Sequence, residues 1–114
     1  MVSAQGKTVI VTGAGSGLGK VIATSFLAAG ANVAACDVVP QRVTDVSNEW
    51  SGAYANKFIA KQVDVTDPAA VQGLVDETVA AYGRLDVVVN AAGIMDAFEP
   101  VGDLPKEKWD RVLN

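Results

Sequence analysis

Two patterns of hydrophobic residues alternate along the sequence. Short runs of Val, Ile and Ala are apolar at consecutive positions, which is typical of strands buried on both faces of a parallel sheet. Between these runs, apolar residues recur every three or four positions, which predicts helices with one buried face. The predicted strands cover residues 8–12, 32–36, 58–63 and 85–90, and the predicted helices begin near residues 18, 40, 68 and 105.

Residues that start and stop helices lie between these segments. Pro40 is placed to open the second helix, and Asp67 followed by Pro68 is a typical cap and first turn for the third. Gly30 is expected to cap the end of the first helix, and Gly83 to stop the third. One set of residues is expected to form the buried face of the first helix: Leu18, Val21, Ile22, Ser25, Phe26 and Ala29.

A regular alternation of strand and helix predicts an α/β fold with a parallel sheet and helices on both faces. The turn after the first strand is rich in glycine, with Gly13, Gly15, Gly17 and Gly19 in quick succession. Glycines at this point allow positive φ angles and a close approach of phosphate to the backbone, and the following helix offers unpaired amides to the anion. With right-handed crossovers, a phosphate turn after the first strand favours the strand order 3-2-1-4.

Composition narrows the classes of function. A chain of 114 residues with 50% hydrophobic residues is long enough for one domain with a core. The net charge of −4 gives no reason to expect nucleic acid or an anionic membrane as partner. With no His and one Cys, a zinc or other metal site is not expected. No apolar run is long enough to span a bilayer and the start of the sequence lacks a secretory signal, so a cytoplasmic location is expected.

The glycine-rich segment resembles the cofactor-binding signature of the short-chain dehydrogenase/reductase family, in the form Thr12-Gly13-x-x-x-Gly17-x-Gly19. Asn90-Ala91-Ala92-Gly93 is similar to that family's Asn-Asn-Ala-Gly motif, with Ala91 at the second position. The resemblance extends from about residue 5 to residue 114 and matches the N-terminal half of the family's domain. It implies one partial, Rossmann-type NAD(P)-binding domain over residues 1–114, truncated after the fourth helix.

Asp37 closes the second strand, where a carboxylate about 20 residues beyond the glycines accepts hydrogen bonds from the adenosine ribose. The same carboxylate repels a 2′-phosphate, and neither Val38 nor residues 14–16 are basic, so NAD is favoured over NADP. Arg42 is the nearby cation that can weaken this preference. The full set of residues that the motifs and the resemblance imply for cofactor binding is Gly13, Ser16, Gly17, Leu18, Gly19, Asp37, Asp64, Val65, Asn90, Ala91, Gly93 and Ile94.

Two of these positions have alternative interpretations. By resemblance, Asp64 and Val65 line the adenine pocket; as plain sequence, Asp64 turns the chain ahead of the Asp67 cap. Asn90 either approaches the cofactor ribose or binds neighbouring backbone to fix the sheet, and both can hold together. By resemblance, Asn114 corresponds to the Asn of the family's catalytic tetrad.

The family's chemistry also needs a Ser and a Tyr-x-x-x-Lys, because a phenol with a pKa near 10 needs a neighbouring cation to act as a base at neutral pH. Tyr54 is followed four residues later by Phe58, and Tyr82 by Asp86, so neither forms this motif. The leading hypothesis is therefore the cofactor-binding half of an NAD(P)-dependent alcohol/ketone oxidoreductase. The alternatives are an NAD-binding module without catalysis and an interaction protein. The last helix and the open edge of the fourth strand, with Val87, Val88 and Val89, favour pairing with a second copy.

Overall fold

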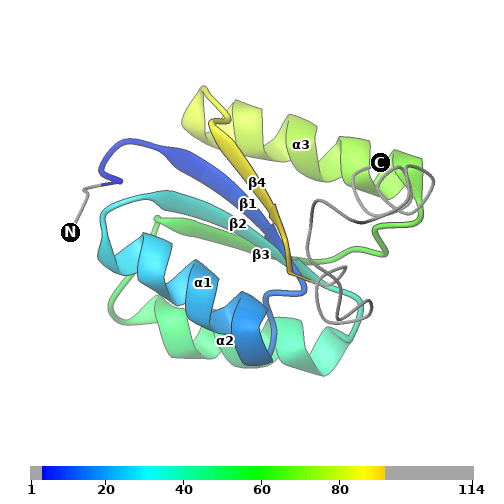
Figure 1. The fold of residues 1–114 in the computed structure, drawn as a ribbon, viewed down its shortest axis with the longest axis horizontal. Helices are drawn as coiled ribbons and strands as arrows, with labels where there is room; N and C mark the ends of the chain where they lie inside the picture. Colours follow the sequence, from blue (N-terminus) through cyan, green and yellow to red (C-terminus); the bar gives the residue numbers. More distant parts are fainter. Residues whose placement is uncertain (1–3, 92–114) are drawn as a thin grey trace, which may run out of the picture.

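The structure is a computed structural model that describes residues 4–91. Four strands and three helices alternate along this part of the chain (Figure 1). Their bounds are β1 Thr8–Thr12, α1 Gly17–Ala28, β2 Asn32–Asp37, α2 Pro40–Ser51, β3 Phe58–Gln62, α3 Pro68–Tyr82 and β4 Val87–Asn90. The fourth helix expected from the sequence lies outside the described residues.

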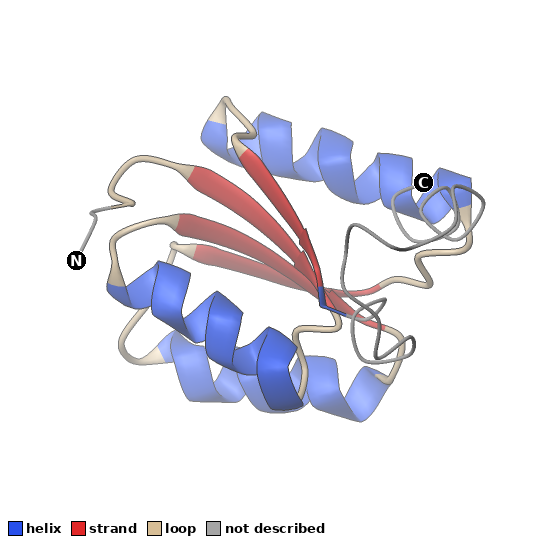
Figure 2. Ribbon diagram, in the orientation of Figure 1, coloured by secondary structure: helices blue, strands red, loops and turns tan. Residues whose placement is uncertain are grey.

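The strands form one parallel sheet in the order β3-β2-β1-β4. Helices α1 and α2 cover one face and α3 covers the other (Figures 1 and 2). The register pairs Thr12 with Cys36 on one side and with Asn90 on the other, so β1, β2 and β4 end side by side. The predicted Rossmann-type fold and its strand order are confirmed, and the glycine-rich turn leaves the sheet at the carboxyl edge, where such sheets bind ligands.

Each buried strand divides its side chains between the two faces, because successive residues of a strand point in opposite directions. Val9 and Val11 pack in a core cluster with residues of α1 and α2, whereas Ile10 packs in a second cluster with Leu74 of α3. Both faces of β1 are thus covered, and all five of its residues are buried. This explains why the strand shows no alternation of polar and apolar residues.

Among residues 4–91, Trp50 of α2 is the largest fully buried side chain, with 1% of its surface exposed. Its ring meets Phe58 edge to face, with 5.5 Å between the centroids, and its Nε1 donates a hydrogen bond to Thr24 Oγ1 over 3.3 Å. The indole therefore joins α1, α2 and β3 on one side of the sheet.

The buried face of α1 differs from the one expected. Its buried residues are Gly19, Ala23 and Leu27, whereas Leu18 is 43% and Val21 62% exposed. Of the residues expected on this face, Ile22 and Phe26 are partly buried and pack against the core. The small residues face the sheet because they let the helix backbone come close to β1 and the glycine-rich turn. The spacing of the apolar residues therefore places the centre of this face one position away from where the structure has it.

The helix ends follow the capping residues with one adjustment. Asp67 Oδ1 accepts hydrogen bonds from the amides of Ala69 and Ala70 at the start of α3, as predicted. The C-cap of α1 is Ala29, and Gly30 follows it with φ of 96°. The amides of Gly30 and Ala31 donate back to carbonyls of the last turn, which is a Schellman ending. Gly83 ends α3 in the left-handed region, as predicted.

Strand β4 begins at Val87, two residues later than expected. The Asp86 carboxylate accepts the amide of Thr8 over 2.9 Å, in the place where a strand carbonyl would act as acceptor. Arg84 donates two hydrogen bonds to the same carboxylate, and this contact holds the pKa of Asp86 below its usual value. The side chain thus ends the ladder at this point. Strand β3 likewise ends at Gln62 rather than at residue 63.

Replacing Thr8 by valine is expected to raise the free energy of unfolding by about 1 kcal/mol. Thr8 is fully buried, and within the described residues its Oγ1 has no hydrogen-bond partner. Valine keeps the shape and removes this unpaired hydroxyl. Urea unfolding followed by circular dichroism measures the change. The matched control is Thr78→Val, because the Oγ1 of buried Thr78 is already bonded to the Leu74 carbonyl; a gain as large in the control would contradict the explanation.

Candidate functional site

The turn between β1 and α1 is held in shape by its glycines. Gly13 and Gly17 have φ of 63° and 57°, in the left-handed region that glycine adopts without strain. A Cβ on Gly19 would lie 2.0 Å from the Gly13 carbonyl oxygen, so the first turn of α1 packs directly on the turn's backbone. The spacing of Gly13 and Gly19 in the glycine-rich segment thus allows the first turn of α1 to contact the backbone of the preceding turn.

The N-terminus of α1 is open to an anion. Ser16 is the N-cap, its side chain makes no capping hydrogen bond, and no acidic residue lies in the first turn. The first amides of a helix have no partner within it and carry the positive end of its dipole. Ser16, Gly17 and Leu18 are exposed at this point. The arrangement fits a phosphate group that accepts hydrogen bonds from these amides.

Asp37 points from the end of β2 to the glycine-rich turn. Its carboxylate is 5% exposed, and Oδ2 accepts the amide of Gly15 over 3.0 Å. Oδ1 accepts the amide of Val39 over 3.0 Å and lies 3.8 Å from Nη1 of Arg42. Each carboxylate oxygen can accept two hydrogen bonds, so each retains one for a further donor. The structure therefore joins the two parts of the motif that the sequence keeps far apart.

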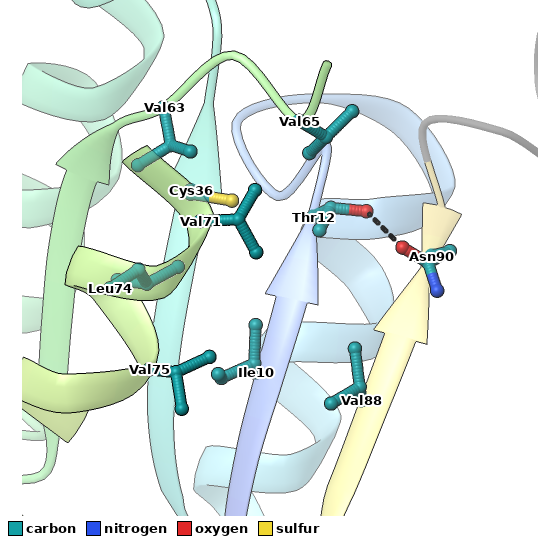
Figure 3. Close-up of a pocket in the computed structure, with 10 residues that line it drawn as sticks. All are labelled: Ile10, Thr12, Cys36, Val63, Val65, Val71, Leu74, Val75, Val88 and Asn90. Carbon is teal, nitrogen blue, oxygen red and sulfur yellow. Dashed lines mark hydrogen bonds between the residues drawn. The ribbon is translucent and has the colours of Figure 1, made fainter. Parts of the chain in front are cut away.

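Thr12 and Asn90 meet across the ends of β1 and β4 (Figure 3). Thr12 Oγ1 lies 3.4 Å from both the Val89 carbonyl oxygen and Asn90 Oδ1. Ala91 is 1% exposed, and a Cβ on Gly19 would lie 3.1 Å from the Ala91 Cβ. A small residue is thus required after Asn90. Thr12 was not among the predicted site residues; its place at the end of the first strand, before the first glycine, is the signal that identifies it.

A largely apolar cavity lies under these strand ends, between the sheet and α3 (Figure 3). It encloses about 400 Å³ of space, part of it open to solvent. Thr12, Cys36, Val65 and Asn90 are among its lining residues. Burial, and to a smaller extent Asp37, raise the pKa of the Cys36 thiol to about 12, so this cysteine is a thiol at neutral pH. Cys36 is a small residue of the core, with 2% of its surface exposed.

Asp64 is engaged in its own turn. Its Oδ1 accepts hydrogen bonds from the amide and the hydroxyl of Thr66, over 2.9 and 2.7 Å. This is the geometry of the turn interpretation, and the adenine contact stays a prediction. Val65 lines the cavity between the sheet and α3. The predicted site residues Gly93, Ile94 and Asn114 lie outside the described residues.

Two absences apply to the described part of the chain. Residues 4–91 contain no group of three or more His, Cys, Asp or Glu side chains that could hold a metal ion. None of the helices within these residues is long and apolar enough to cross a bilayer.

Comparison with known proteins gives consistent matches. A family model described as short chain dehydrogenase matches residues 7–114. A short chain dehydrogenase/reductase of Macrophomina phaseolina is 50% identical over 96% of this chain, which spans 62% of that relative's length. A short chain dehydrogenase/reductase from Burkholderia phymatum, solved in complex with NAD, superposes with a TM-score of 0.73 at 30% identity, over 79% of this chain and 32% of that one. The C-domain of a bacterial malonyl-CoA reductase, solved with NADP, superposes with a TM-score of 0.69 at 26% identity, over 95% of this chain and 18% of that one.

Proposed function

The chain belongs to the short-chain dehydrogenase family. We propose that it binds NAD and forms the cofactor-binding part of an oxidoreductase, which transfers hydride between the nicotinamide and an alcohol or ketone. The observation that carries the proposal is the Asp37 carboxylate, which is buried and directed at the Gly15 amide of the glycine-rich turn. The family membership favours this function over an interaction protein that needs no nucleotide.

The residues present fit a dinucleotide. The Gly13 and Gly17 backbone conformations and the missing side chain at Gly19 form a cradle at the start of α1, where the pyrophosphate would accept hydrogen bonds. Asp37 would accept hydrogen bonds from the adenosine ribose. Its position at the carboxyl end of β2 would set the distance between the ribose and the pyrophosphate. In this proposal the cofactor supplies the hydride chemistry, and these side chains supply binding and orientation.

The remaining predicted roles belong to the same proposal. Thr12 and Asn90 meet at the ends of β1 and β4. In this proposal Asn90, Ala91 and Gly93 would let the backbone approach the cofactor ribose, and Ile94 would pack near the nicotinamide. Asn114 is proposed as the tetrad residue that acts through its neighbours rather than on the hydride itself. Residues 1–114 include no Tyr-x-x-x-Lys, so within this chain we assign cofactor binding and not the proton transfer.

Replacing Asp37 by asparagine is expected to weaken binding of NADH about 10-fold or more, because hydrogen bonds to a charged acceptor contribute about 1.5–3 kcal/mol. Titration of the 114-residue chain with NADH, followed by nucleotide fluorescence, measures this. Asp45→Asn on the exposed side of α2 is the matched control, and we expect it to bind like the unchanged chain. No binding of NADH by the unchanged chain at millimolar concentration would overturn the proposal.

We also propose a second copy of the chain as partner, along the open edge of β4 or through the last helix. Val87 and Val88 of β4 are 40% and 46% exposed, on opposite faces of an edge with no charged residue. The other edge strand, β3, carries Lys61, which pairs with Glu77 and keeps that edge polar. An apolar edge favours pairing with another strand, and a charged one opposes it.

Val88→Lys is expected to leave the chain monomeric at 11.7 kDa in light scattering, whereas the unchanged chain gains mass as its concentration rises. A lysine at this edge places charges against each other in a paired sheet. Val38→Lys is the matched control, because Val38 is 57% exposed and lies away from β4. An unchanged chain that stays monomeric at millimolar concentration would contradict pairing along β4.

A further inference from the structure

The outer side of β4 is an open edge within residues 4–91. In the order β3-β2-β1-β4, one side of β4 pairs with β1, and no other strand of this part of the chain pairs with its outer side. The strand Val87–Asn90 carries no charged residue. An open edge presents unpaired amides and carbonyls, which another strand can satisfy.

The register of the sheet shows which main-chain groups of β4 point outward. Odd positions of β1 bind β2, as the carbonyl of Lys7 does, so Ile10 at an even position binds β4. Ile10 has Val88 as its partner, and a residue in a parallel ladder binds the residues on either side of its partner. The carbonyl of Val89 accordingly accepts a hydrogen bond from a side chain of β1. The main-chain groups of Val88 and Asn90 therefore point to the open edge.

Antiparallel pairing with an identical strand satisfies these groups best in one register. With Val88 opposite the partner's Asn90, two pairs form across the strands, and the residues of each pair exchange two hydrogen bonds. With Val88 opposite the partner's Val88, Asn90 would face Asp86. The Asp86 amide is already bonded to the Thr8 carbonyl, so that pair would not form. The first register leaves fewer groups unpaired.

We propose that two copies pair their β4 strands in antiparallel orientation, about a twofold axis between their Val89 residues, with Val88 of each copy opposite the partner's Asn90. The inference rests on the second copy proposed above and refines it by naming the strand and the register. Residues directly opposite each other share a face of the sheet. Val88 and Asn90 both line the cavity between the sheet and α3 (Figure 3). The partner's Val88 therefore adds an apolar side chain beside Asn90, at the candidate site.

The charges around this edge suit a second copy. Pairing β4 with itself brings no charged residues of the strand together, and Asp86, just before it, already accepts two hydrogen bonds from Arg84. A twofold contact uses the same edge of both copies, so the assembly closes at two. Because the paired strands run in opposite directions, the two glycine-rich turns lie at opposite ends of the joined sheet.

Disulfide cross-linking tests the register. The two residues 89 form a pair without hydrogen bonds, whose Cα atoms lie about 4.5 Å apart, within reach of a disulfide. The two residues 88 are diagonal neighbours at about 7–8 Å, which is too far. With oxidised glutathione and non-reducing electrophoresis, we expect mainly covalent dimer from Val89→Cys and mainly monomer from the matched control Val88→Cys. The chain's one cysteine, Cys36, is 2% exposed, so the unchanged chain is expected to give no cross-link.

Amide hydrogen exchange of the unchanged chain provides a measurement that needs no substitution. The amides of Val88 and Asn90 are expected to exchange about 10-fold more slowly or less when the chain concentration is raised until pairing is complete. The amide of Val87, which faces β1, is the internal control and is expected to change little.

The outcomes separate the proposals. Cross-linking of Val88→Cys as extensive as that of Val89→Cys would overturn the inference, as would exchange at Val88 and Asn90 that does not depend on concentration in a chain that gains mass. An unchanged chain that stays monomeric would overturn the second copy and the inference together. A chain that pairs in this register and does not bind NADH would support the inference and overturn the proposed cofactor binding.

Discussion

Replacing Gly19 by alanine is expected to lower the free energy of unfolding by about 3 kcal/mol and to abolish dinucleotide binding. The added Cβ would lie 2.0 Å from the Gly13 carbonyl oxygen and 2.7 Å from the carbonyl carbon. Neither neighbour is a flexible side chain, so the overlap is relieved only when α1 moves away from the turn. That movement separates the first amides of α1, which we propose as phosphate donors, from the glycines of the turn. Urea unfolding and an NADH titration measure the two losses.

The chain offers a matched control for this substitution. Gly73 lies on the exposed side of α3, and a Cβ there would meet nothing within 4 Å. Gly73→Ala is expected to raise the free energy of unfolding by up to about 1 kcal/mol, because alanine favours a helix more than glycine does. If Gly19→Ala were as well tolerated as Gly73→Ala, the close packing of α1 on the turn would be contradicted.

Trp50→Ala is expected to lower the free energy of unfolding by about 3–5 kcal/mol, a large part of the stability of a small domain. The indole is 1% exposed, meets Phe58 edge to face, and donates to Thr24 Oγ1. Its loss leaves a cavity among α1, α2 and β3, which the surrounding backbone cannot close fully. Chemical unfolding followed by far-UV circular dichroism measures the change.

Trp50→Phe separates volume from hydrogen bonding. Phenylalanine keeps an aromatic ring against Phe58 and loses the Nε1 donor, so the expected loss is about 1–2 kcal/mol. A loss equal to that of Trp50→Ala would assign most of the effect to the hydrogen bond and contradict the packing explanation.

The strands and their order were predictable from the sequence because their signals are local and strong. Strand β1 is β-branched throughout, with three apolar residues between two threonines, and leads into the glycine-rich turn. Strand β2 is short and ends at Asp37. The right-handed crossover then leaves few topologies. The start of β4 was not predictable, because it depends on the Asp86 carboxylate, which binds an amide 78 positions away in the sequence.

The candidate site was predictable where a residue's role follows from its place on the sheet. Asp37 was predicted from its place at the end of β2, and its carboxylate accepts the amide of Gly15 in the glycine-rich turn. Its contact with a ribose stays a prediction. The predicted face of α1 was wrong at Leu18 and Val21, which are exposed, whereas Ile22 and Phe26 of the same set pack against the core. Gly19 was missed because its burial follows from the close approach of the helix backbone to the turn. Hydrophobic periodicity does not detect this contact, because it depends on which side chains are apolar and not on the distance between the helix and the turn.

The two donors that hold Asp37 are main-chain amides, those of Gly15 and Val39. A substitution alters a side chain and leaves an amide in place at every residue except proline. The orientation of the Asp37 carboxylate is therefore expected to survive most substitutions in the surrounding loop. The exposed neighbours Val38 and Arg42 can accordingly vary without loss of the two hydrogen bonds that hold this carboxylate.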